Sequence, residues 1–254
     1  GDLMAYRPWN IVAHPTAGFE ILTAKEADPS GLGYTSGRVQ TRGKFEFQYG
    51  TIEFKMRLPQ PIGIALWPAG WLRGAMWPQS GEIDLFEHRG KYALNKYYLT
   101  AHGPQTAYPT KEWQQQYVTP TNSTTPANDL MAGQYGLPHV YRCEWTPGSI
   151  KLYLDQILYH TVLKPNIGAS NTWPFDTNPL YLVFNVAVGG WAGTPSGLTE
   201  HRTHVEYVRV WQEVADPSPD PTPAPPSPSA RERAQQRLSA LGFLADEIPE
   251  VLNA

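Results

Sequence analysis

The sequence predicts an all-β protein built as a sandwich or jelly roll of two antiparallel sheets. Apolar and polar residues alternate at period two in short segments, such as 51–57, 150–155, 182–188 and 205–211. Loops rich in Gly, Pro, Asn and Thr separate these segments, and no long helical periodicity occurs before residue 229. Many short strands joined by such turns are typical of sandwiches and jelly rolls. A chain of 254 residues is long enough for one large domain with a sizeable core.

The first clear strand is 51–57, where Ile52, Phe54 and Met56 share one face. The next notable strand carries a concentration of acids. Residues 81–89 read Gly-Glu-Ile-Asp-Leu-Phe-Glu-His-Arg, so apolar residues separate the three carboxylates.

Period two places Glu82 and Asp84 on one face of this strand, whereas Glu87 has the opposite parity. One extra residue, a β-bulge around Leu85–Phe86, would return Glu87 to the acidic face. Three carboxylates on one face repel one another and perturb one another's pKa values, so the cluster favours a chemical role.

Glycoside hydrolysis uses such a set, because one carboxylate attacks the anomeric carbon and another protonates the leaving oxygen. The alternative is that this alternation marks an ordinary solvated strand face. Trp67, Trp71 and Trp77 shortly precede the acids, and tryptophan rings suit the apolar faces of sugars. Most tryptophans in any fold nevertheless belong to the core. His88 and His102 could approach the acids, although an ordinary hydrogen-bonded histidine is the more common case.

Later segments complete the sandwich. The polar, turn-rich stretch Thr106–Pro138 is interpreted as loops beside the cleft. Cys143, the one cysteine of the chain, excludes an intrachain disulfide, and the alternation around it predicts a buried thiol.

The composition changes at Asp216, where a proline-rich run to Pro228 predicts an extended linker. A helix is expected after the capping box of Ser229 and Glu232, but this tail is too short to form a core. We therefore expect a catalytic sandwich domain over 1–214, a linker over 215–229 and a helical tail over 230–254.

Composition and motifs exclude several function classes. The formal net charge is −3, so no basic nucleic-acid footprint is present. No run approaches the roughly 20 apolar residues of a membrane span. The histidines form no metal-binding spacing, and neither a glycine-rich phosphate loop nor a nucleophile elbow occurs. We expect a monomer that binds polysaccharide, without nucleic-acid or membrane partners.

The segments Leu66–Trp71 and Trp77–Glu87 resemble the active-site region of glycoside hydrolase family 16, in its laminarinase-like branch with the bulged acid motif. Further segments resemble the family in the same order along the chain: Tyr34–Arg38, Lys44–Gly50, His102–Pro104, Glu144–Pro147, Ile150–Asp155, Asn185–Gly190 and Tyr207–Val210. The resemblance covers roughly residues 19–212.

The resemblance implies a concanavalin A-like jelly roll and retaining endo-hydrolysis of internal β-1,3, or mixed β-1,3/1,4, glucosidic bonds. It makes Glu82 the nucleophile and Glu87 the acid and then base, with Asp84 hydrogen-bonded between them. Spacing alone leaves the order of the two glutamates open. The resemblance also implies substrate contacts for residues that lie in the matching segments beside the acids or beside the Gly189–Gly190 turn. The substrate-binding residues that we expect are Trp77, Trp71, Arg38, His102, Trp191 and Asn185.

Two alternatives accompany this interpretation. A non-catalytic β-glucan-binding module could share the fold, but such relatives are expected to lose one or both glutamates, and here both remain. A hydrolase of a β-galactan such as agarose would share the bulged acid motif.

The match departs from the family at the N-terminus, where the usual acidic opening strand is either missing or replaced by Ala5–Ile11. The family's structural calcium site draws partly on that opening, and Glu206 stands where an aspartate is common. We expect no cofactor for the chemistry and leave this calcium open. The chain begins at Gly1 rather than Met, so we expect a processed start and a secreted, extracellular protein.

Overall fold

The computed structural model describes residues 1–58, 65–90, 96–118 and 138–213. Gly1–Gln212 forms one compact unit, and Glu213–Ala254 is a separate one. The expected linker and helical tail lie outside the described residues, so the domain boundaries remain predictions.

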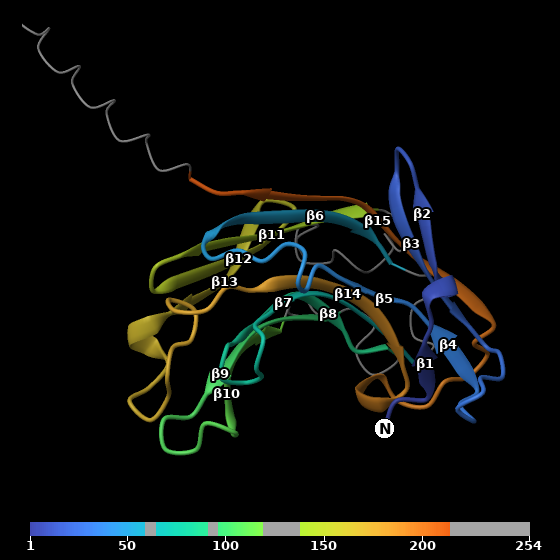
Figure 1. Ribbon diagram of the computed structural model, residues 1–254, viewed down its shortest axis with the longest axis horizontal. Coiled ribbons are helices and arrows are strands. Elements are labelled where there is room, and N and C mark those ends of the chain that lie inside the picture. Colours follow the sequence, from blue (N-terminus) through green and yellow to red (C-terminus); the bar gives the residue numbers. More distant parts are fainter. Residues whose placement is uncertain (59–64, 91–95, 119–137, 214–254) are drawn as a thin grey trace, which may run out of the picture. The chain divides into compact units, whose positions relative to one another are not determined.

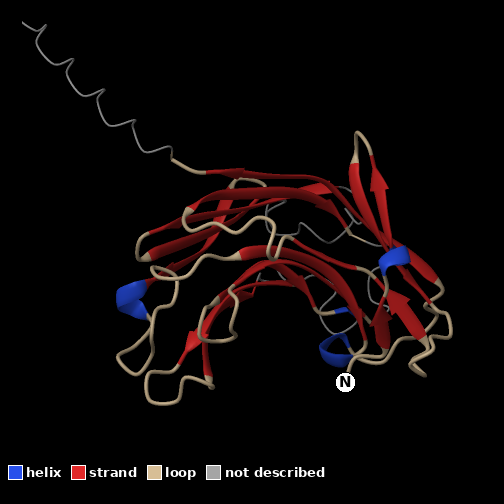
Figure 2. Ribbon diagram, viewed as in Figure 1, coloured by secondary structure: helices blue, strands red, loops and turns tan. Residues whose placement is uncertain are grey.

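The compact unit is a sandwich of two stacked sheets, which confirms the predicted all-β class (Figures 1 and 2). The larger sheet, in spatial order, contains β1 (Met4–Tyr6), β4 (Tyr34–Ser36), β3 (Gly18–Ala24), β15 (Glu200–Trp211), β6 (Gly50–Arg57), β11 (Pro138–Thr146), β12 (Ser149–Leu154) and β13 (Ile157–Leu163), with β2 (Ile11–His14) paired to β3. The smaller sheet contains β10 (Glu112–Val118), β9 (Tyr97–Pro104), β8 (Glu82–His88), β7 (Leu66–Arg73), β14 (Tyr181–Val188) and β5 (Arg38–Gln40). Short 3₁₀ turns lie at η1 (Pro8–Asn10), η3 (Lys164–Asn166) and η4 (Gly190–Ala192).

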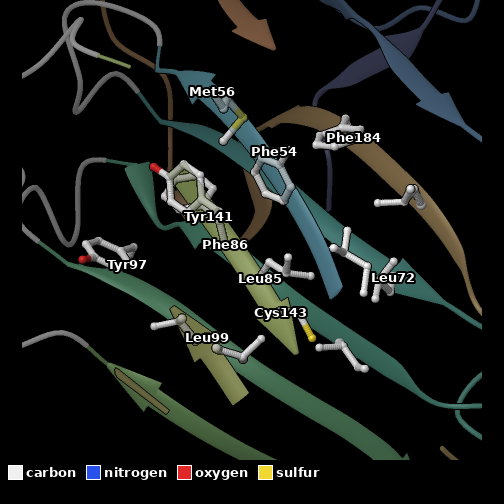
Figure 3. Packing of buried hydrophobic residues seen from close by; sticks show 14 of the residues in the cluster. Phe54, Met56, Leu72, Leu85, Phe86, Tyr97, Leu99, Tyr141, Cys143 and Phe184 are labelled. Carbon is white, nitrogen blue, oxygen red and sulfur yellow. The ribbon is translucent and has the colours of Figure 1, made fainter. Parts of the chain in front are cut away.

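The core fills the space between the two sheets. The alternation predicted for β6 holds, since Ile52, Phe54 and Met56 are all buried. The Phe54 ring stacks on Tyr141 of β11 with 5.1 Å between the ring centroids, and the Tyr141 ring packs on Phe86 of β8 with 4.7 Å between the centroids (Figure 3). Aromatic residues of both sheets therefore interlock beneath the acid strand.

Cys143 is a buried free thiol, as its alternation predicted. It lies among the core side chains (Figure 3), where burial raises the pKa of the thiol well above its usual range. A thiol held neutral in this way is a poor nucleophile, so Cys143 contributes packing.

The interpretation of Thr106–Pro138 as loops is wrong in part. Residues 112–118 form the edge strand β10, which pairs antiparallel with β9. Its run of glutamines hides the strand signal, because an edge strand tolerates polar residues on its open side. Trp113 is the buried anchor of this strand. Residues 119–137 lie outside the described part of the chain.

The N-terminal segment does not form a single strand over Ala5–Ile11. β1 ends at Tyr6 and pairs in parallel with β4, the η1 turn follows, and β2 pairs with β3. Pro8 at the start of η1 interrupts the extended chain. The residues before β1 reach the end of β14, where the Leu3 N–H donates to the Val188 carbonyl over 2.9 Å.

Gly70 of β7 provides the space in which the core packs under the acid strand. It pairs with Phe86 on one side and Phe184 on the other. A Cβ at Gly70 would lie 2.5 Å from the Phe54 ring.

Gly70→Ala should therefore overpack the core and lower the free energy of unfolding by about 1–3 kcal/mol. Gly33→Ala is the matched control, since a Cβ there meets nothing within 4 Å. Urea unfolding of the two variants measures the difference. Equal stabilities would contradict this description of the core.

Candidate active site

A β-bulge brings the three acids of β8 to one pocket, as their spacing predicted. Asp84 pairs with Thr100 of β9 and Glu87 with Tyr98, so three steps along β8 match two along β9. Leu85 and Phe86 are adjacent in sequence, yet both are buried in the core. Because two consecutive side chains point inward, the parity of the strand changes and Glu87 returns to the side of Glu82 and Asp84.

The acids line a pocket of about 220 Å³ on the outer face of the smaller sheet. The pocket is lined by Asp2, Tyr6, Arg38, Trp67, Ala69, Trp71, Glu82, Asp84, Glu87, Asn185 and Ala187. Asp84 is buried, whereas Glu82 and Glu87 are half-buried. The pocket therefore presents two partly accessible carboxyl groups around a buried third one.

The two glutamates share a raised proton affinity. Burial, followed by the charge of Asp84, raises the pKa of Glu82 to about 8. The same two causes raise the pKa of Glu87 well above its usual range. Positive charge from His102 and Arg73 opposes the shift at Glu82, and the indole N–H of Trp67 and then the charge of His102 oppose it at Glu87. The surroundings thus raise the proton affinity of both carboxyl groups, and the charges of His102 and Arg73 reduce that effect at Glu82.

His102 of β9 holds Asp84. Its Nε2 lies 3.0 Å from Asp84 Oδ2 and 3.9 Å from Glu82 Oε1. Burial lowers the proton affinity of the imidazole, but the hydrogen bond and charge of Asp84 and the neighbouring carboxylates outweigh it and raise the pKa of His102 to about 10. His88 is buried, and its Nδ1 accepts a hydrogen bond from the Gly90 N–H over 3.1 Å.

Trp67 orients Glu87. Its indole N–H donates to Glu87 Oε1 over 2.9 Å. The Trp67 ring packs on Trp191 of η4 with 5.1 Å between the ring centroids. Trp191 in turn packs on Tyr98 with 4.6 Å between the centroids. Trp191 therefore packs against the pocket residue Trp67 and is not among the residues that line the pocket.

A second hydrogen-bonded chain fixes the opposite side of the pocket. The Trp71 indole N–H donates to Asn185 Oδ1 over 2.8 Å, and Asn185 Nδ2 donates to the Tyr6 hydroxyl over 3.0 Å. The Arg38 guanidinium lies over the Trp71 ring at 5.0 Å. These are polar groups with defined directions beside an aromatic face, the combination that sugar hydroxyls and sugar C–H faces require.

The structure brings half of the six expected substrate-binding residues to the pocket. Arg38, Trp71 and Asn185 line the pocket with the acids. Trp77 is 40% exposed and does not line it, so its expected role as a subsite remains a prediction.

Two pocket residues could not be found from the sequence pattern. Asp2 and Tyr6 reach the pocket because the N-terminal segment lies against β14, with Asp2 bridged to Gly189. Trp67 was noted only as a tryptophan near the acids. Its spacing of four residues from Trp71 along β7 is the available signal, since an even spacing places both side chains on one face of a regular strand.

Comparison with known proteins identifies the family. The model of glycosyl hydrolases family 16 matches residues 10–209. The chain belongs to this family.

Named relatives agree with this membership. The chain is 32% identical over 222 residues to a β-glucanase of Rhodothermus marinus, covering 78% of this chain and 69% of that protein. It is also 32% identical over 194 residues to a β-1,3-glucan-binding protein of Penaeus monodon, covering 65% of this chain but 49% of that protein. The fold is similar to that of the laminarinase catalytic domain from Thermotoga maritima MSB8, with a TM-score of 0.69, 32% identity and 85% of each chain covered.

Glu206, where the family resemblance suggested a calcium ligand, does not fit that ion. Its Oε2 lies 2.8 Å from Lys55 Nζ, and its Oε1 lies 3.7 Å from an Arg57 nitrogen. Two cations therefore already neutralise this carboxylate, and their charge would repel Ca²⁺.

Within the described residues, no helix is long and apolar enough to cross a membrane.

Trp67→Phe should move the alkaline limb of the pH profile of kcat/KM. The indole N–H stabilises the Glu87 carboxylate, so its loss raises the pKa of Glu87 further. Because Glu87 then keeps its proton to higher pH, the limb should move up by about half a unit or more.

Trp71→Phe is the matched control, since it removes an indole N–H that is bonded to Asn185 instead of to an acid. Its alkaline limb should stay in place. A limb that stays fixed or moves down in Trp67→Phe would contradict the assignment of this hydrogen bond.

Proposed function

We propose that this chain hydrolyses internal β-1,3-glucosidic bonds of laminarin-type polysaccharides, and mixed β-1,3/1,4 bonds as well, with retention at the anomeric carbon. One observation carries this proposal: the bulge in β8 brings Glu82 and Glu87 to one pocket around the buried Asp84. Retention requires two carboxyl groups about 5–5.5 Å apart, without room for water between them.

In the first step, the Glu82 carboxylate attacks the anomeric carbon while Glu87 gives its proton to the leaving glycosidic oxygen. The bond from the anomeric carbon to that oxygen breaks, and an ester to Glu82 forms. In the second step, water attacks the same carbon while Glu87 takes its proton, and Glu82 leaves as a carboxylate.

The surroundings of the two acids support this division of roles. His102 and Arg73 bring positive charge to Glu82, which favours the ionised form that attack requires. Glu87 has the more strongly desolvated site and keeps a proton to donate. The Trp67 N–H fixes one of its oxygens, which directs the other toward the pocket.

A binding module without catalysis is the alternative class. One relative in this family carries the name of a β-1,3-glucan-binding protein. The presence of both glutamates, with Asp84 between them, favours the enzyme, because binding alone needs no clustered carboxylates of raised pKa.

The substrate assignment is supported by relatives whose names specify β-glucanase and laminarinase. A polymer of this kind is too large to cross a membrane, so we also propose that the protein acts outside the cell as a monomer.

Release of reducing ends from laminarin, lichenan, agarose and xyloglucan tests the proposal. We expect the fastest release from laminarin, slower release from lichenan, and none from agarose or xyloglucan. Glu82→Gln is the control, and it should abolish release from every polymer.

Release from agarose would instead assign a β-galactan hydrolase. Binding of laminarin without release would assign the binding module. Either result would contradict the proposed reaction.

A further inference from the structure

His102 lies between two carboxylates on two different strands. Its Nε2 faces Asp84 Oδ2 of β8 at 3.0 Å, and its Nδ1 faces Glu112 Oε2 of β10 at 2.7 Å. The imidazole therefore links the buried acid of the pocket to an acid outside it, because Glu112 is not among the pocket-lining residues.

The geometry itself indicates the charge of this imidazole. A neutral imidazole carries one N–H and one lone pair, so one nitrogen would face a carboxylate oxygen with no proton between them. The imidazolium donates from both nitrogens and satisfies both carboxylates. The raised pKa of His102 agrees with this form.

Glu82, the proposed nucleophile, competes with His102 for this proton. Glu82 Oε1 is 3.9 Å from His102 Nε2, and the pKa of Glu82 is itself raised to about 8. A proton that leaves His102 withdraws the positive charge that favours the Glu82 carboxylate, so Glu82 then binds its own proton more tightly. A protonated Glu82 cannot attack.

We propose that Glu112 is a positioning residue that keeps the shared proton of this cluster on His102 and off Glu82. Glu112 supplies the second anion that the imidazolium needs, and it does so from β10 without entering the pocket. This inference rests on the proposed double displacement, in which Glu82 must be ionised.

The charged groups around His102 come from three strands. Glu82, Asp84 and Glu87 lie on β8, Arg73 lies on β7 beside Glu82, and Glu112 lies on β10. Gln114, which pairs directly with His102, is neutral.

Two effects of Glu112 on Glu82 oppose each other. Its own negative charge raises the pKa of Glu82 slightly, whereas the His102 charge that it supports lowers that pKa more strongly. The effect through His102 therefore decides the sign.

Glu112→Gln tests the proposal, because glutamine keeps the size and an acceptor oxygen but loses the charge. The acid limb of the kcat/KM profile, which reports ionisation of Glu82 in the free enzyme, should move to higher pH by about half a unit or more. Below the limb this corresponds to about a threefold loss of kcat/KM. Glu200→Gln removes the same charge from an exposed residue of β15, and its profile should stay unchanged.

The same substitution in a His102→Gln background shows whether His102 carries the effect. In that background Glu112→Gln should no longer move the acid limb of the kcat/KM profile to higher pH, and the limb should stay in place or move slightly to lower pH. A limb that stays in place in the single variant, or that moves up equally in the His102→Gln background, would overturn the proposal.

Nitrogen NMR of the His102 ring supplies a readout that needs no substrate. Both ring nitrogens should remain protonated through the working pH range of the parent enzyme, and in Glu112→Gln the ring should lose its proton at lower pH. A His102 titration that is identical in the two proteins would overturn the proposal. Failure of the proposed function would appear differently, as a parent enzyme that releases no sugar from laminarin.

Discussion

The site depends on one constraint, the β-bulge at Leu85–Phe86. Both side chains are buried in the core, although they are neighbours on one strand. Burial of two large apolar side chains stabilises the protein by several kcal/mol, on the order of 1.5–3 kcal/mol each, so the core holds the irregular backbone in place. The pocket face receives Glu87 as a result. The packing that stabilises the sandwich and the geometry that places the acids are therefore the same feature.

Electrostatics then divides the work between two similar carboxyl groups. Burial and then the charge of Asp84 raise the proton affinity of both glutamates, and the positive charge of His102 and Arg73 reduces that effect at Glu82. Because the two acids share one buried neighbour, a change at any member of the cluster alters the others. The hydrogen bonds of His102 extend this coupling to Glu112, which is beyond the pocket.

Local pattern was sufficient to predict much of this structure. The period-two alternation predicted β6 and the buried Cys143, and the opposite parity of Glu87 relative to Glu82 and Asp84 predicted the bulge. Polar glutamines concealed the edge strand β10, since half-exposed strands need few apolar residues. The pocket residues Asp2 and Tyr6 come from a segment distant in sequence from the acids, and the contact from Glu112 to His102, ten residues apart, crosses from the unpredicted strand β10 to β9. Such contacts depend on strand order and register, which no local pattern encodes.

The most direct test of the central claim is azide rescue of the two acid variants on an activated aryl β-glucoside. In Glu87→Ala the Glu82 carboxylate should still attack, since the leaving group needs no proton, and the glycosyl-enzyme should accumulate for want of a base. Added azide should then restore turnover and yield the β-glycosyl azide. If azide instead rescues Glu82→Ala with an α-glycosyl azide, the roles of the two glutamates are reversed and the account is contradicted.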